Sequence, residues 1–146
     1  RARWDAALIE RGLSGLERAE ALSASRGPYT LQAAIAACHA RARKAEDTDW
    51  RRIAALYGEL AAVSPSPVVE LNRAVAVAMA EGPEHGLALM RDLPLDEYHL
   101  YHAARADLLR RLERLDEAAA AYRRALELAQ TEPERRFLSR RLAEIS

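Results

Sequence analysis

The sequence predicts an all-α protein of stacked antiparallel helix pairs, and three observations lead to this prediction. Half of the 146 residues are hydrophobic, but only 5% are aromatic and alanine is abundant. This composition favours close packing of helices over strands, which prefer β-branched and aromatic residues. No segment alternates apolar and polar residues with a period of two, so no strand is predicted. Prolines, glycines and polar caps divide the chain into short blocks, typical of helices joined by tight turns.

The overall charge and cysteine content exclude several classes of protein. The 22 basic and 22 acidic residues cancel, and a domain that binds nucleic acid by itself usually carries a basic excess. A single cysteine excludes an internal disulfide framework and fits a reducing compartment. No apolar run approaches the ~20 residues of a membrane span. We therefore expect a cytoplasmic domain without direct contact to nucleic acid or membrane. Because the chain begins at Arg1 rather than methionine, we also expect it to be part of a longer protein.

Local signals set the boundaries of the expected helices. Pro28 follows Gly27 and suits a first helical turn, where its missing N–H costs little. Asp49 is an N-cap candidate, and Thr131 with Glu134 fits a capping box. The expected helices span residues 4–11 and 13–24 (one helix or two), 28–45, 49–63, 67–81, 83–91, 96–113, 116–129 and 132–145.

A repeat becomes visible when the chain is shifted against itself by 32 residues. An Arg-Ala step then recurs at residues 41–42, 73–74 and 105–106. Small residues at such positions are typical of a helix–turn–helix repeat, because two helix axes approach too closely there for a large side chain. Tyr122 is expected to fill the space beside Ala118, with Met90 in that place one repeat earlier and Tyr57 substituting for Gly58 in the first. The other coinciding positions are Ala54, Gly86 and Ala118, and then Ala61, Leu93 and Ala125.

This pattern resembles the tetratricopeptide repeat, although the usual period of that family is 34 residues. The family's helix-A tryptophan is missing, and Glu113 stands where a glycine is expected between two helices. A positive φ angle at Glu113 would cost about 1 kcal/mol. The resemblance implies a right-handed α-solenoid that forms a single domain, residues 1–146. Its expected parts are an N-terminal helical segment (1–26), three repeats (27–64, 65–95 and 96–130) and a C-terminal capping helix (131–146).

A second resemblance covers essentially the whole chain and rests on several segments together. The segments are Arg3-Trp4-Asp5, Gly27-Pro28-Tyr29 with Leu31 to Ala37, Thr48-Asp49-Trp50, Pro65 to Val69 with Leu71 to Ala76, Tyr98-His99 with His102 to Ala106, Tyr122 to Leu126, and Arg135 to Leu138. Together they resemble the C-terminal extension of a class of bacterial extracytoplasmic-function RNA polymerase sigma factors. Thr30, where glutamine is expected, and Glu113 are departures from that pattern.

The resemblance to sigma factors implies a function for the longer protein. Such a protein binds core RNA polymerase and directs it to promoters through regions that precede this extension and are absent here. The extension is needed for sigma activity and takes the place of a membrane-bound anti-sigma factor. We therefore expect a protein-interaction or regulatory domain whose partner is core RNA polymerase, the sigma factor's own N-terminal regions, or both. No cofactor is expected.

A polypeptide partner is expected on the concave face of the solenoid. The arginine that recurs once per repeat allows two interpretations. Arg41, Arg73 and Arg105 either form ion pairs between stacked repeats, with Glu70, Asp107 or Glu59 as partners, or form a basic strip that binds an acidic peptide or helix. The candidate partner-binding residues are Tyr29, Gln32, His39, Asn72, Arg73, Tyr98, His102 and Arg105.

The cysteine and the histidines considered for catalysis or metal binding are expected to have structural roles. Cys38 belongs to an apolar helical stripe and reads as a small buried hydrophobe. His39 cannot activate it, because adjacent helical side chains diverge by about 100°. His99 and His102 could share a metal ion with Asp96, but further ligands with suitable spacing are missing. Neither an enzyme nor a metal site is expected. In the last helix we expect Arg135, Arg136, Arg140 and Arg141 to face solvent and Phe137, Leu138 and Leu142 to be buried.

An alternative function remains open from the sequence. The domain could sense a small molecule and gate the sigma factor by closing around a metabolite. The residues expected to line that site are Tyr29, Tyr57, Tyr98 and Tyr101.

Overall fold

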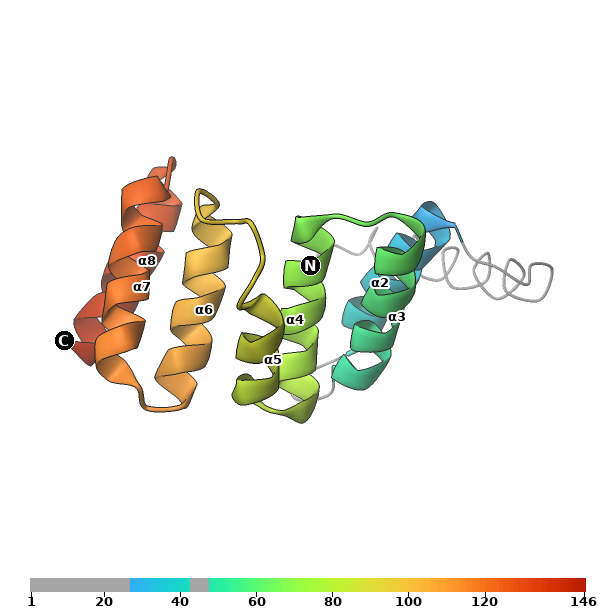
Figure 1. Ribbon diagram of the computed structural model, residues 1–146, viewed down its shortest axis with the longest axis horizontal. Coiled ribbons are helices and arrows are strands. Elements are labelled where there is room, and N and C mark those ends of the chain that lie inside the picture. Colours follow the sequence, from blue (N-terminus) through green and yellow to red (C-terminus); the bar gives the residue numbers. More distant parts are fainter. Residues whose placement is uncertain (1–26, 43–47) are drawn as a thin grey trace.

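The computed structural model describes residues 27–42 and 48–146, and all regular structure within these ranges is helical (Figure 1). The all-α prediction is therefore confirmed for the described residues. The expected helices at 4–11 and 13–24 lie outside them. The helices are α2 (Pro28–Arg41), α3 (Trp50–Val63), α4 (Pro67–Glu81), α5 (Pro83–Met90), α6 (His99–Arg111), α7 (Leu115–Leu128) and α8 (Glu132–Ile145).

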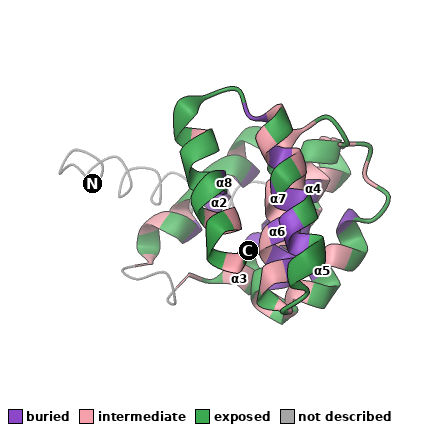
Figure 2. Cartoon of the chain, turned by 90° about the vertical axis from the view of Figure 1, so that its left-hand side faces the viewer, coloured by how far each residue is buried: buried purple, intermediate pink, exposed green. Residues whose placement is uncertain are grey.

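Helices that follow one another in the chain pack side by side. The pairs α2–α3, α4–α5 and α6–α7 stand next to one another in an elongated row, and α8 packs against α7 at its end (Figure 1). The first helix of the second pair, α4, also contacts the first helix of the third pair, α6. Three connected clusters of buried apolar side chains lie within and between these pairs. The buried positions follow the faces that helices turn toward their neighbours (Figure 2). No helix in the described part of the chain is long and apolar enough to cross a membrane.

Side-chain caps explain why three helices begin where they were expected. The carboxylate of Asp49 accepts a hydrogen bond from the backbone N–H of Arg52 at 3.1 Å. The hydroxyl oxygens of Ser66 and Thr131 accept from the N–H groups at the starts of α4 and α8. In the predicted capping box, Glu134 reaches back to the N–H of Gln130 rather than to that of Thr131. Each cap satisfies a donor that the helix itself leaves unpaired.

Two expected helix boundaries are wrong. The first described helix ends at Arg41 instead of continuing to residue 45, because Ala42 has extended backbone angles of φ −73° and ψ 126°. Helix α6 begins at His99 instead of residue 96. The segment before it forms turns, with hydrogen bonds from Leu95 to Leu93 and from Tyr98 to Leu95. These hydrogen-bonded turns take the place of the first helical turn that was expected.

In the turn between α6 and α7, Glu113 stands at the position of the expected glycine and has a positive φ angle of +59°. The backbone N–H of Glu113 donates to the carbonyl of Arg110, and that of Arg114 donates to the carbonyl of Leu109. These are the two hydrogen bonds of a Schellman motif, which ends a helix through one residue with positive φ. The turn therefore keeps the geometry of a glycine-containing connection although glutamate occupies the position.

The small residues that recur every 32 positions are buried between the helices of the second and third pairs. Ala74 and Gly86 are buried where α4 meets α5, and Ala106 and Ala118 are 0% exposed where α6 meets α7. Met90 and Tyr122, the expected space-filling residues, are each 1% exposed. The first pair follows the pattern less closely. Its first small residue, Ala42, lies beyond the end of α2, whereas Tyr57 packs against the core cluster as predicted.

Gly86 shows how closely α4 and α5 approach. A Cβ atom at this position would lie 2.5 Å from the Cβ of Ala78 and 2.8 Å from the carbonyl oxygen of Ala74. Because the second neighbour is backbone, the clash cannot be relieved by rotation of a side chain. Glycine is thus required by packing here, whereas a Cβ at Gly58 would make only an ordinary contact at 3.7 Å with the Arg73 side chain.

These two glycines make a matched pair of substitutions. We expect Gly86→Ala to lower the free energy of unfolding by about 1–3 kcal/mol, because two helices must move apart. Gly58→Ala is expected to raise it by roughly 0.5–1 kcal/mol, because alanine replaces a flexible residue inside a helix. Urea denaturation followed by circular dichroism measures both values. Equal effects of the two substitutions would contradict the close approach at Gly86.

Candidate functional site

The candidate residues on α2 differ in their exposure and in their contacts. Tyr29, in the first turn of the helix, is 89% exposed, and Gln32 is also exposed. His39 lies near the other end and meets the ring of Trp50 edge-on, with ring centroids 5.5 Å apart. His39 therefore contributes to the contact between α2 and α3, while Tyr29 and Gln32 are open to solvent.

Asn72 and Arg73 lie next to each other on α4 but differ in their contacts. Asn72 is exposed. The guanidinium of Arg73 lies 3.7 Å from the carboxylate of Glu70, one turn earlier in the same helix. Glu70 was one of the partners expected for these arginines, but this pair joins two residues of one helix and does not bridge two repeats.

Tyr98 and His102 lie at the start of α6 and contact the segment before it. Tyr98 lines a cavity of about 520 Å³ together with Val68 of α4 and residues 94–97. The Nε2 atom of His102 lies 2.8 Å from the backbone carbonyl oxygen of Asp96. This histidine therefore ties residues 91–98 to α6.

His99, the second member of the histidine pair, lies 3.4 Å from the carboxylate of Glu134 at the start of α8. Within the part of the chain that the structure describes, no three metal-ligating side chains form a cluster. His99 and His102 thus contact residues near the starts of α8 and α6.

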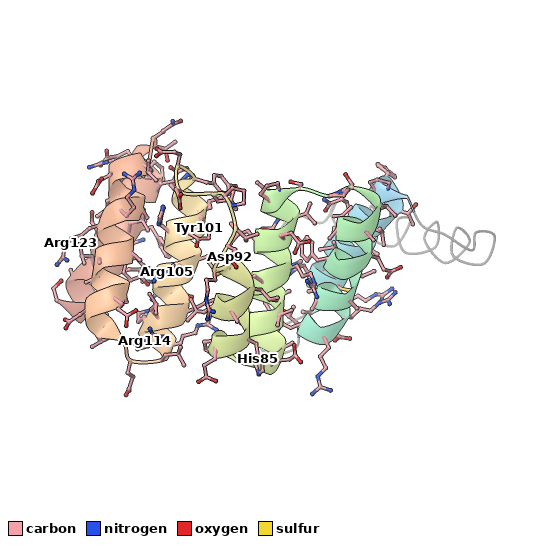
Figure 3. All side chains as sticks on the ribbon, in the orientation of Figure 1. His85, Asp92, Tyr101, Arg105, Arg114 and Arg123 are labelled. Atoms are coloured by element: carbon pink, nitrogen blue, oxygen red, sulfur yellow. The ribbon has the colours of Figure 1, made fainter. Side chains whose placement is uncertain are left out.

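Arg105 lies in a different place, a groove between α5 and α6 with a volume of about 410 Å³. We call this the α5–α6 groove. Arg105, Tyr101 and Arg114 all lie along α6 and the turn that follows it (Figure 3). The residues that line the groove are Glu84, Leu87, Ala88, Arg91, Tyr101, Arg105, Leu109 and Arg114.

The ion pairs around the groove do not include Arg105. Asp107, a predicted partner of the repeating arginines, instead pairs with Arg110 at 2.6 Å and with Arg111 at 3.5 Å. For Arg105, the expected ion pair between stacked repeats is therefore wrong. Arg114 forms a two-pronged contact with Glu117, with distances of 3.0 and 2.8 Å. Arg105 is half-buried and has no ion pair with any described residue.

Sequence reasoning selected Arg105 but missed Arg91 and Arg114, which share its groove. The repeat contains a signal for both. A shift of 32 residues aligns Arg91 with Glu59 and Arg114 with Gly82, so each of the two positions changes charge from one repeat to the next.

Tyr101 forms the inner wall of the groove and supports the end of α5. Its hydroxyl donates a hydrogen bond to the backbone carbonyl of Met90 at 3.1 Å, and the side chain is 7% exposed. This bond satisfies one of the carbonyls that the end of a helix leaves unpaired. Burial raises the pKa of Tyr101 above its usual value of 10.0, and the nearby Arg105 opposes this shift.

In the last helix, the prediction that Phe137 is buried is wrong. Leu138 is 2% exposed as expected, but Phe137 is 45% exposed and carries the guanidinium of Arg141 over its ring at 5.2 Å. The repeat explains this orientation, because residue 137 aligns with Arg73 and Arg105, whereas residue 138 aligns with the buried Ala74 and Ala106. Arg135 does not simply face solvent either, since it donates to the carbonyl of Leu126 at 2.8 Å.

Cys38 is a core residue, as predicted. It is 8% exposed in the cluster formed by α2 and α3. Burial raises the pKa of its thiol above 9.0, although Arg52 and Arg41 oppose the shift. A raised pKa disfavours the reactive thiolate.

The tyrosines expected for a metabolite site do not converge. Tyr57 packs against the core of the first pair, while Tyr29 is open to solvent. Tyr98 and Tyr101 line different cavities.

Comparison with known proteins identifies one longer relative. No family model matches the chain, and no solved structure matches it. An uncharacterized protein of Rhizobium meliloti (strain 1021) is 44% identical over 141 residues, which are 95% of this chain. The chain spans about one third of that protein's length, 33%.

The hydrogen bond of Tyr101 leads to a prediction about stability. We expect Tyr101→Phe to lower the free energy of unfolding by about 1 kcal/mol near neutral pH, because the Met90 carbonyl loses its donor. The pKa of Tyr101 is raised in the folded state, so its contribution is present below pH 10.0 and is lost as the pH rises through the folded-state value. The difference between wild type and variant should therefore shrink above pH 10.0.

Urea denaturation at pH 7.5 and at high pH measures this difference. Tyr29→Phe serves as the control, because the Tyr29 side chain is 89% exposed. A Tyr101→Phe protein as stable as the control at pH 7.5 would contradict a supporting role for the hydroxyl.

Proposed function

We propose that the chain is a tetratricopeptide-like interaction domain of a bacterial RNA polymerase sigma factor, and that it supports transcription initiation by binding a polypeptide. The observation that carries the proposal is the 32-residue register. It places Ala74 against Gly86 and Ala106 near Ala118, so that successive helix pairs have small buried residues at aligned positions. Stacked repeats of this kind produce extended binding surfaces.

The pairs are proposed to stack as a right-handed α-solenoid. In a solenoid, like helices of successive repeats contact each other. The contact between α4 and α6 is of this type, and it includes an approach of 2.8 Å between the Arg111 guanidinium and the Met79 sulfur. Residues 79 and 111 are separated by one repeat, so this contact joins equivalent positions.

Side chains available to a partner occur on the first helix of each pair. Gln32 on α2 and Asn72 on α4 are exposed, and Arg105 on α6 is half-buried without an ion pair among the described residues. These positions support the interpretation of the arginines as contacts to an acidic peptide. They are also consistent with a binding surface distributed over several repeats.

The identity of the longer protein rests on the residue resemblance to sigma-factor extensions. The Rhizobium relative, three times as long as the aligned region, supports a domain that works within a larger protein. The proposed partners are core RNA polymerase, the sigma factor's own N-terminal regions, or both, in the cytoplasm. The zero net charge fits a domain that leaves DNA contact to other regions.

Two neighbouring substitutions on α4 test this proposal in the full-length protein that carries the domain. We expect Asn72→Ala combined with Arg73→Ala to lower promoter-dependent transcription several-fold, because both side chains are placed on the proposed partner surface. The domain should remain folded, since Asn72 is exposed and Arg73 makes only a partly exposed pair with Glu70.

In vitro transcription with purified core polymerase measures the effect, and circular dichroism verifies the fold. Arg123→Ala is the matched control, an exposed arginine on α7. If a folded double variant transcribes as well as the control, this surface does not bind the partner.

A further inference from the structure

Each helix pair meets the following pair, or α8 at the end of the row, at equivalent positions, but these three places differ in charge. We call them the first junction (α3 with α4), the second junction (α5 with α6) and the third junction (α7 with α8). At the second junction Arg105 aligns with Arg73 of the first and with Phe137 of the third. The arginine is thus kept at the second junction, whereas other aligned residues of the two junctions differ.

Two carboxylates of the first junction have no counterpart at the aligned positions of the second junction. Glu70, which pairs with Arg73, is replaced by His102, and Glu59 is replaced by Arg91. His102 is already engaged with the carbonyl oxygen of Asp96. Arg105 is thus left half-buried without a carboxylate partner among the described residues, so its guanidinium is available to an anion.

The second junction also gains a cation. Arg114 stands where the first junction has Gly82 and the third has Ser146. Three arginines consequently line the α5–α6 groove with one carboxylate, that of Glu84, an excess of two positive charges. Glu117 pairs with Arg114 and partly offsets that charge, and Asp92 lies close enough to Tyr101 to influence its pKa. Arg91 and Arg105 have no carboxylate within ion-pair distance among the described residues.

The arginines are spread along the groove rather than gathered around one point. Arg91 follows the end of α5, near Tyr101, whose hydroxyl bonds the Met90 carbonyl. Arg105 lies one turn further along α6, and Arg114 lies in the turn after α6. In Figure 3, Tyr101, Arg105 and Arg114 follow one another down the molecule. Leu87, Ala88 and Leu109 supply apolar surface between the charges.

We infer that the α5–α6 groove binds the side-chain carboxylates of an acidic segment in the polypeptide partner. The inference rests on the proposed function and names the chemistry of the partner. Guanidinium groups match carboxylates through paired hydrogen bonds, and a line of three suits an extended chain with several carboxylates better than one compact anion. Arg105 is the central contact, and Arg91 and Arg114 hold the flanking carboxylates.

A capped hexaglutamate peptide is the probe, with hexaglutamine as the uncharged control and isothermal titration calorimetry at low salt as the measurement. The 146-residue chain should bind hexaglutamate and not hexaglutamine. We expect Arg91→Gln combined with Arg105→Gln to weaken binding roughly tenfold or more, because charge-assisted hydrogen bonds are lost. Arg123→Gln, which removes an equal charge at the position equivalent to Arg91, should leave affinity within about twofold.

A second variant covers the case in which the double substitution disturbs folding. Arg91→Glu restores the charge of the first junction at an exposed position, and it should weaken hexaglutamate binding as strongly. Equal weakening by Arg123→Gln would show that net charge, not the groove, attracts the peptide, and would overturn the inference. Binding of succinate or inorganic phosphate as tight as that of hexaglutamate would assign the groove to small anions instead and would also overturn it.

These experiments distinguish failure of the groove assignment from failure of the proposed function. If hexaglutamate does not bind, while substitution of Asn72 and Arg73 still lowers transcription, the groove assignment fails and the interaction domain stands. If hexaglutamate binds as described but neither those substitutions nor Arg105→Gln affects transcription, the groove stands and the proposed role in transcription fails.

Discussion

The close contact between α4 and α5 at Gly86 is the constraint on which the rest of the structure depends. It sets the helices so near each other that the position tolerates no Cβ atom. The same register recurs at Ala106 and Ala118, which are fully buried between α6 and α7. Ala118, which aligns with Gly86, carries a Cβ atom, so the two pairs share the use of small buried residues but only the α4–α5 contact requires glycine.

The second helix pair departs from this regular stacking because α5 is short. Helix α5 covers residues 83–90, whereas α3 and α7 each contain 14 residues. The turns of residues 91–98 replace its second half, held by Tyr101 through the Met90 carbonyl and by His102 through the Asp96 carbonyl. These contacts fix the position of α6 beside α5, and they place Arg91 at one end of the groove that Arg105 lines.

The features predictable from sequence were those encoded locally or by repetition. The caps at Asp49 and Thr131, the positive φ at Glu113 and the burial of Ala74 and Ala106 follow from short motifs and from the 32-residue period. The early end of α2 and the late start of α6 did not follow, because residues 42–45 and 96–98 contain no proline or glycine that would mark a helix boundary.

The candidate site was predictable only in part, because it depends on which helix faces meet. A period analysis identifies Arg105 as one of a repeating set and aligns Arg91 with Glu59, but it does not show that Arg91, Arg105 and Arg114 line one groove. Phe137 was misplaced for a similar reason. Its apolar character suggested burial, yet its register position is that of the repeating arginines, which lie at the edge of the packed face.

A pair of in-cell crosslinks tests most directly whether the domain binds a polypeptide through its second junction. A photoreactive amino acid replaces Ala88 in the α5–α6 groove or, as the control, Ala120, the equivalent exposed position on α7. Crosslinked peptides in the full-length protein are then identified by mass spectrometry. We predict that position 88 crosslinks to an acidic segment of an RNA polymerase subunit or of the protein's own other regions, and that position 120 does not. Equal crosslinking from both positions, or products from position 88 unrelated to transcription, would contradict this function.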